Sequence, residues 1–144
     1  MKVALSLVGL GLMIIGVLSL GALGALFVVN AFVIVAQVCA AALMVWARLT
    51  FGLRSFHAAA NPTEGGLVTS GPYAYIRHPI YTAICLFVLP AALASWSVLG
   101  VALGTLVFAG SLMRMLSEER LLIGMYPAYA TYAAATKRMI PRLF

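Results

Sequence analysis

Two long apolar blocks, separated by a polar stretch, dominate the sequence. Residues 3–47 contain no charged side chain, and neither do residues 79–113. A transmembrane helix needs about 20 apolar residues, so the first block is long enough for two spans and the second for two short ones. We expect the chain to turn near Gly24 in the first block and near Trp96 in the second. The pattern therefore predicts two helical hairpins and four membrane-spanning helices.

The four spans organise the chain as a single membrane domain over residues 1–144. We expect it to have four parts: a helical hairpin over residues 1–50, a polar loop over residues 51–78, a second hairpin over residues 79–116, and a C-terminal segment over residues 117–144. The helices are predicted over residues 3–22, 27–50, 79–94 and 98–116, the last of them running on past the membrane, with short helices near residues 53–60 and 127–136. Asn30 and Gln37 are polar residues in the second span, and we expect them to hydrogen-bond neighbouring helices.

Composition supports a membrane protein and gives it an orientation. The chain is 65% hydrophobic and only 8% charged, far below the roughly 25% of a soluble domain. Its first apolar block is too long for a cleaved signal peptide. In the four-span arrangement all nine basic residues fall on one side, which predicts that both termini are cytoplasmic in an inner or plasma membrane. The net charge of +6 therefore indicates topology and attraction to membrane lipids, and not nucleic-acid binding.

The segment from Gly71 to Ala83 gathers most of the chemistry between the two hairpins. Gly71 and Pro72 are turn residues, and Pro79 is suited to the first position of a helix. This places Arg77 and His78 at the mouth of the third span.

A second polar cluster follows the fourth span. Arg114 and Glu118 are four residues apart on one helical face and can pair, whereas Glu119 points about 100° around the helix. Folding the second apolar block at its midpoint, Trp96, returns Glu118 and Glu119 to the depth of His78. We therefore expect the two polar clusters to form one site.

The residue types in this site favour a small zwitterion or a cation with a flat ring. Carboxylates suit an amine or a sulfonium, arginine suits a carboxylate, and aromatic faces suit a base or a cation. Neither histidine has the spacing of a zinc ligand, and Cys39 and Cys85 form no metal or disulfide pattern, so no metal is expected. The chain has no aspartate for a Ser-His-Asp triad and no glycine-rich phosphate loop.

The chain resembles the isoprenylcysteine carboxyl methyltransferase family, and the related phospholipid methyltransferases of membranes, over roughly residues 67–142. The motifs are, in order, Gly71-Pro-Tyr-x-x-x-Arg77-His78-Pro79-x-Tyr81, Arg114-x-x-x-Glu118-Glu119-x-x-Leu122, and Tyr129-x-x-Tyr132 followed by Arg138-x-x-Pro141. The resemblance implies an all-α integral-membrane enzyme that uses S-adenosylmethionine. It places the cofactor pocket at the cytoplasmic ends of the last two spans, covered by the C-terminal segment.

The resemblance also implies roles for individual residues. Glu118 and Glu119 would hold the cofactor or place the methyl acceptor, and Arg114 would brace these carboxylates as the third catalytic residue. Ala83 stands where the family usually has glycine. The other residues implied to bind the cofactor are Arg77, His78, Pro79, Tyr81, Tyr129 and Tyr132, with Arg120 and Arg138 as further candidates in the covering segment.

The expected function is methyl transfer to a lipophilic acceptor, resembling an isoprenylcysteine carboxylate, that enters from the membrane. A phospholipid amine or a small thiol is the alternative acceptor; these need a base, for which Glu118, Glu119 and His78 are the candidates. A small four-span transporter and a non-catalytic membrane scaffold are alternatives from other classes, although the predicted spans lack interior ionisable residues. The glycine-rich first helix permits a homodimer.

Overall fold

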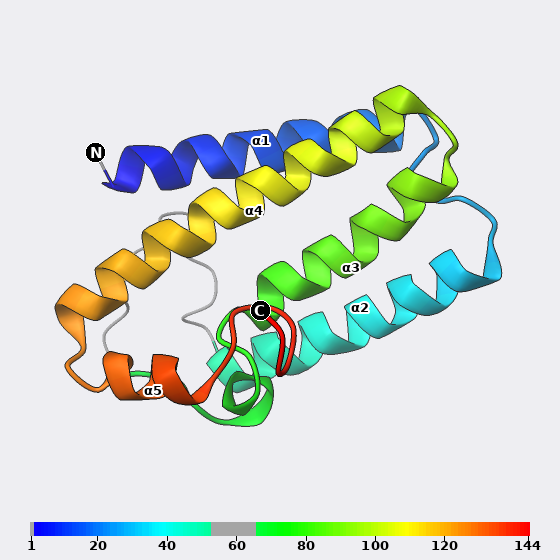
Figure 1. The fold of residues 1–144 in the computed structure, drawn as a ribbon. Helices are drawn as coiled ribbons and strands as arrows, with labels where there is room; N and C mark the ends of the chain where they lie inside the picture. The colour runs from blue at the N-terminus through cyan, green and yellow to red at the C-terminus, as the bar shows by residue number, and fades with distance from the viewer. Residues whose placement is uncertain (1, 53–65) are drawn as a thin grey trace.

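The computed structural model describes residues 2–52 and 66–144, and this part of the chain is helical, as predicted. The described residues form five α-helices, which are labelled in Figure 1, and one short 3₁₀ helix. They are α1 (Lys2–Ala22), α2 (Ala31–Phe51), η2 (Gly71–Ala74), α3 (Pro79–Ala94), α4 (Val98–Met125) and α5 (Tyr129–Ala135). The short helix predicted near residues 53–60 lies outside the described residues.

Within residues 2–52 and 66–144, three helices are long and apolar enough to cross a membrane. They are α1 from Ala4, α2, and α4. The fourth predicted span, α3, is an apolar helix of 16 residues, slightly shorter than the ~17–25 residues typical of a span. Large apolar side chains such as Phe32, Val38 and Leu49 are exposed on the outside of α2, as expected for a surface that faces lipid. The prediction of an all-α integral membrane protein is confirmed.

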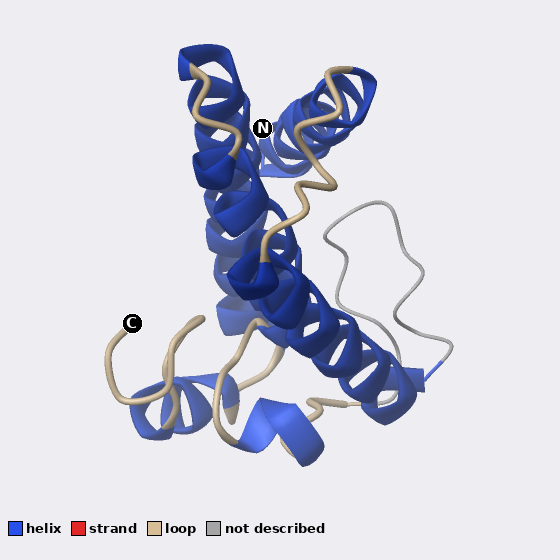
Figure 2. Cartoon of the chain, turned by 90° about the vertical axis from the view of Figure 1, so that its right-hand side faces the viewer, coloured by secondary structure: helices blue, strands red, loops and turns tan. Residues whose placement is uncertain are grey.

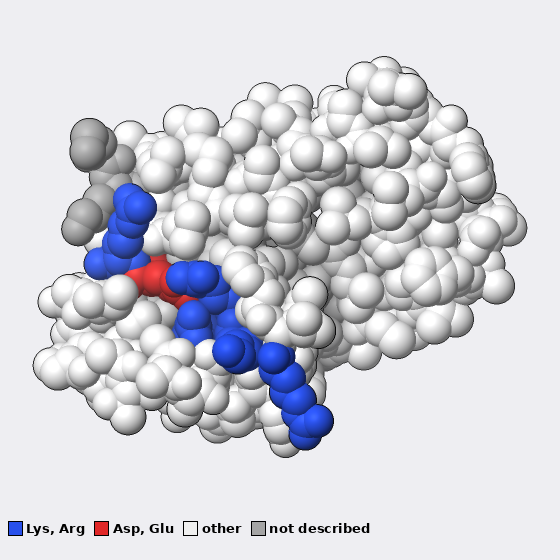
Figure 3. Space-filling model, in the orientation of Figure 1, with Lys and Arg blue, Asp and Glu red and all other residues white. Residues whose placement is uncertain are grey.

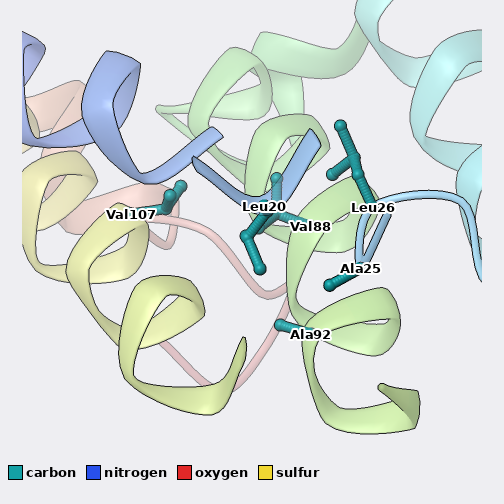
Figure 4. Packing of buried hydrophobic residues seen from close by; sticks show 6 residues of the cluster. All are labelled: Leu20, Ala25, Leu26, Val88, Ala92 and Val107. Atoms are coloured by element: carbon teal, nitrogen blue, oxygen red, sulfur yellow. The ribbon is translucent and has the colours of Figure 1, made fainter. Parts of the chain in front are cut away.

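The α3–α4 hairpin forms the centre of the bundle. α1 packs along α4, and α2 packs along α3 (Figure 1). At the end of the bundle where the hairpins turn, a buried apolar cluster joins the link after α1 to α3 and α4, as Figure 4 shows; it contains Leu20, Ala25, Leu26, Val88, Ala92 and Val107. Gln37 Nε2 of α2 donates to the carbonyls of Leu26, at 2.7 Å, and Phe87, at 3.4 Å, which confirms the bonding expected of Gln37.

Asn30 has a different role from the one expected. Its side-chain oxygen accepts hydrogen bonds from the backbone N–H groups of Phe32, at 2.9 Å, and Val33, at 3.4 Å. Asn30 is therefore the N-cap of α2, and it satisfies donors of its own helix instead of bonding a neighbouring one.

Close contact between α1 and α4 depends on glycines. A β-carbon at Gly110 would lie 2.6 Å from the Gly9 carbonyl oxygen, and one at Gly9 would lie 2.7 Å from the Gly110 carbonyl oxygen. Both distances are too short for any side chain. Part of the glycine content of α1 therefore serves packing within the chain, as small residues do between membrane helices. Gly11, by contrast, has no atom within 4 Å of such a β-carbon.

Replacing Gly110 with alanine is expected to destabilise the protein by about 1–3 kcal/mol, because the new methyl group must separate two backbones. The measurement is the thermal unfolding midpoint in detergent. Gly11→Ala is the matched control, since it adds the same atom to open space and should leave the midpoint unchanged or higher. Equal midpoints for Gly110→Ala and wild type would contradict the packing shown.

Candidate functional site

The α3–α4 hairpin brings the two polar clusters together, as the sequence predicted. α3 begins at Pro79, directly after His78, and the chain turns at Ser95–Ser97 before α4 returns. The His78 ring is buried between the two carboxylates. Its Nε2 lies 3.3 Å from Glu119 Oε1, and its Nδ1 lies 3.7 Å from Glu118 Oε2. Neighbouring residues of α4 thus face the two nitrogens of one histidine.

Glu119 is enclosed by basic side chains from two other parts of the chain. Arg77 Nε donates to Glu119 Oε1 at 3.0 Å, and Arg138 Nε donates to Glu119 Oε2 at 3.0 Å. Arg77 Nη1 also donates to the carbonyls of Ala133, at 2.8 Å, and Thr136 near the end of α5. We call Arg77, His78, Glu119 and Arg138 the Glu119 cluster. It joins α4 to the C-terminal segment.

Glu118 is held differently and remains more accessible. The Tyr81 hydroxyl donates to Glu118 Oε1, and Arg114 Nε donates to that hydroxyl at 3.0 Å. Arg114 Nη2 also lies 3.9 Å from Glu118 Oε1, which confirms the pair predicted by the four-residue spacing. The Glu118 side chain is 26% exposed, against 9% for Glu119. Of the two carboxylates, Glu118 is therefore the one that a ligand can reach.

The C-terminal segment folds over the start of α3. The backbone N–H of Arg77 donates to the Lys137 carbonyl at 2.7 Å, and that of His78 donates to the Arg138 carbonyl at 2.9 Å. The Thr82 hydroxyl donates to the Met139 carbonyl at 2.9 Å. In Figures 1 and 2, α5 and the chain that follows it lie across this end of the bundle. The resemblance implies a C-terminal segment that covers a cofactor pocket, and the structure places residues 137–139 against the two polar clusters.

Tyr129 and Tyr132 take part in this contact. Tyr129 is almost completely buried, and the Tyr132 hydroxyl donates to the Tyr73 carbonyl at 2.7 Å. Burial raises the pKa of Tyr132 to about 12, so this phenol keeps its proton near neutral pH.

Arg120, also named from the resemblance, is exposed on α4. Pro79 is buried and starts α3, and Ala83 is buried within the same helix.

Figure 3 shows how charge is distributed on one face of the molecule. Basic side chains gather around the acidic ones at one end, and the other end of this face carries no charged side chain. Arg114 reaches across to α1 as well, where its Nη1 donates to the Ser6 carbonyl at 3.4 Å. This contribution of α1 was not predictable, because a backbone carbonyl leaves no signal in the sequence. Within the described residues, no group of three His, Cys or Glu side chains could hold a metal ion.

The chain was compared with known proteins. The model of the isoprenylcysteine carboxyl methyltransferase family matches residues 26–124. Among curated proteins, the cobalt-zinc-cadmium resistance protein CzcN of Cupriavidus metallidurans is 37% identical over 78 residues, which cover 54% of this chain. The match spans 36% of the length of that relative. No solved structure matches the chain.

Proposed function

Because the chain belongs to the isoprenylcysteine carboxyl methyltransferase family, we propose that it is an S-adenosylmethionine-dependent methyltransferase that acts on a lipophilic acceptor in the membrane. The observation that carries this proposal is the environment of Glu118. Tyr81, Arg114 and His78 fix the orientation of this carboxylate, which stays partly exposed at the end of the α3–α4 hairpin.

The residues present fit the cofactor. The partly exposed Glu118 carboxylate matches a sulfonium or an ammonium group, and His78 and Tyr81, both buried, hold this carboxylate in place. When bound, the cofactor supplies the methyl group from its sulfonium. Glu118, His78 and Tyr81 would hold it, and Tyr129 and Tyr132 of the covering segment would keep water out. Arg114 would fix Tyr81 and Glu118 in position.

The exposed apolar faces of the helices support an acceptor that comes from the lipid phase. A carboxylate acceptor, such as an isoprenylcysteine, needs no base. A phospholipid amine or a small thiol needs a base, and Glu118 or His78 would take its proton.

The polar end of the bundle, where the basic side chains gather, would lie in the cytoplasm according to the positive-inside rule.

The test combines binding with transfer. Calorimetry on detergent-purified protein should detect S-adenosylmethionine and S-adenosylhomocysteine binding. Incubation with a methyl-labelled cofactor and membrane lipid extract should move label into a solvent-extractable product. Binding without transfer to any lipid extract or isoprenylcysteine analogue would favour a non-catalytic scaffold. Absence of binding by folded protein would overturn the proposal and favour a small transporter.

A further inference from the structure

Residues 139–144 form a closed turn, which we call the hook. The backbone N–H of Ile140 donates to the Phe144 carbonyl at 2.7 Å, and those of Leu143 and Phe144 donate to the Ile140 carbonyl at 3.2 and 3.1 Å. Arg142, inside the turn, has a φ of 67°, in the left-handed region that residues with a side chain rarely adopt. The hydrogen bonds across the turn fix which side chains the hook presents to its surroundings.

One side of the hook is held against the helices. The Thr82 hydroxyl, in the first turn of α3, donates to the Met139 carbonyl at 2.9 Å, and the buried Met139 side chain belongs to an apolar cluster with side chains of α1, α3 and α4. Arg138, a member of the Glu119 cluster, lies 5.7 Å from the centre of the Phe144 ring. Figure 1 shows the hook, in red, close to the start of α3.

The other side of the hook is apolar and exposed. Ile140, Leu143 and Phe144 are all exposed, Leu143 by 80%, and Arg142 is exposed among them. Neighbouring exposed apolar side chains mark an interaction surface. A basic residue among them is typical of segments that lie in a membrane interface, where anionic lipid headgroups attract positive charge.

The length of α3 places this surface at the edge of the bilayer. α3 has 16 residues and is therefore about 24 Å long, whereas the hydrocarbon core of a membrane is about 30 Å thick. A helix of this length that crosses the membrane must begin within the apolar layer or at its edge. The hook contacts the first turn of this helix at Thr82, so it lies where acyl chains meet headgroups. A lipid surface fits the hook better than a protein partner in water.

We propose that the hook is a membrane anchor that binds anionic lipids. Ile140, Leu143 and Phe144 enter the edge of the acyl-chain layer, and the Arg142 guanidinium binds a lipid phosphate, a group that arginine can contact with two hydrogen bonds. The anchor is independent of methyl transfer, so its test needs neither the cofactor nor an acceptor.

Tryptophan fluorescence in lipid nanodiscs tests the insertion. Leu143→Trp places a fluorophore on the hook, and the emission of the native Trp46 and Trp96, measured in wild type, is subtracted. Met125→Trp is the control, because Met125 is also exposed and apolar but lies about 10 Å beyond Glu118 along α4. Apolar side chains of interfacial segments are buried about 5–10 Å, so brominated acyl chains should quench Leu143→Trp at least about twofold more than Met125→Trp.

A comparison of two brominated lipids tests the role of Arg142. At equal fractions, brominated phosphatidylglycerol should quench Leu143→Trp about fivefold more effectively than brominated phosphatidylcholine, the effect of one basic side chain near an anionic surface. Adding Arg142→Gln to Leu143→Trp should abolish this preference. The unfolding midpoint of each variant should equal that of wild type, because the replaced side chains are exposed.

Three results would contradict the anchor. Equal quenching of Leu143→Trp and Met125→Trp by brominated lipid would show that the hook stays in water. Protection of Leu143→Trp from both brominated lipid and aqueous acrylamide would mean that a protein segment or a second copy of the chain covers the hook. Equal quenching of Leu143→Trp by the two lipids would show that Arg142 binds no anionic headgroup.

Discussion

Replacing Glu118 with glutamine is expected to weaken S-adenosylmethionine binding about 100-fold and to leave the fold intact. Glutamine has nearly the same shape, and its amide oxygen can still accept the hydrogen bond from Tyr81. What it lacks is the negative charge that would face the sulfonium and the ammonium group. Hydrogen bonds to charged groups contribute about 1.5–3 kcal/mol, which converts to roughly 10- to 150-fold in affinity. Calorimetric titration of the purified variant measures the change.

The control for this experiment is Lys137. Its side chain is exposed, and Lys137→Gln changes the net charge by one unit while it leaves the Glu118 contacts and the Lys137 backbone carbonyl in place. Its binding constant should stay within about twofold of wild type, because exposed charges are screened at physiological salt. Unchanged affinity of Glu118→Gln would mean that the accessible carboxylate does not face the cofactor. A lowered unfolding midpoint in Glu118→Gln would show that the loss of binding has a structural cause.

The sequence predicted best the parts of the fold that local chemistry determines. α3 runs from Pro79 to Ala94, as expected, because proline suits the first helical position and Ser95–Ser97 interrupt the apolar run. The start of α2 was less predictable: the helix begins at Ala31 and not near residue 27. Residues 26–29 are as apolar as the helix itself, so hydropathy could not show the boundary. The N-cap formed by Asn30 is the signal that marks it.

The candidate site was predictable as a neighbourhood but not in detail. Helical geometry places Glu118 and Glu119 on different faces, and the hairpin brings both to His78. Which carboxylate receives the arginines depends on the path of the C-terminal segment. Along that path the segment forms a parallel backbone bridge between Ile76 and Lys137, which no periodicity encodes. The accessible Glu118 and the enclosed Glu119 could therefore be distinguished only in three dimensions.

Replacing Glu119 with leucine is expected to destabilise the protein by about 3–5 kcal/mol, the usual effect of leaving a buried charge without its partner. Arg77 would keep its charge without a carboxylate partner, with its side chain only 9% exposed and its remaining hydrogen bonds made to backbone carbonyls. Arg138 is 37% exposed and can turn to water, so Arg77 accounts for most of the loss. The unfolding midpoint measures the total effect. Hydrogen exchange should locate it, with lost protection over residues 129–144 and retained protection in α1 and α2.

A second substitution tests whether the Glu119 cluster acts through the ion pair or through packing. Arg77→Met removes the stranded charge, together with the donor to the carbonyls of Ala133 and Thr136. If the ion pair dominates, the double variant Arg77→Met/Glu119→Leu should be more stable than the sum of the two single losses by about 1–3 kcal/mol, as for residues in direct contact. Additive losses would mean that Arg77 stabilises the protein mainly by capping α5. In that case the link between Glu119 and the C-terminal segment would depend on Arg138, which donates to the same carboxylate at 3.0 Å.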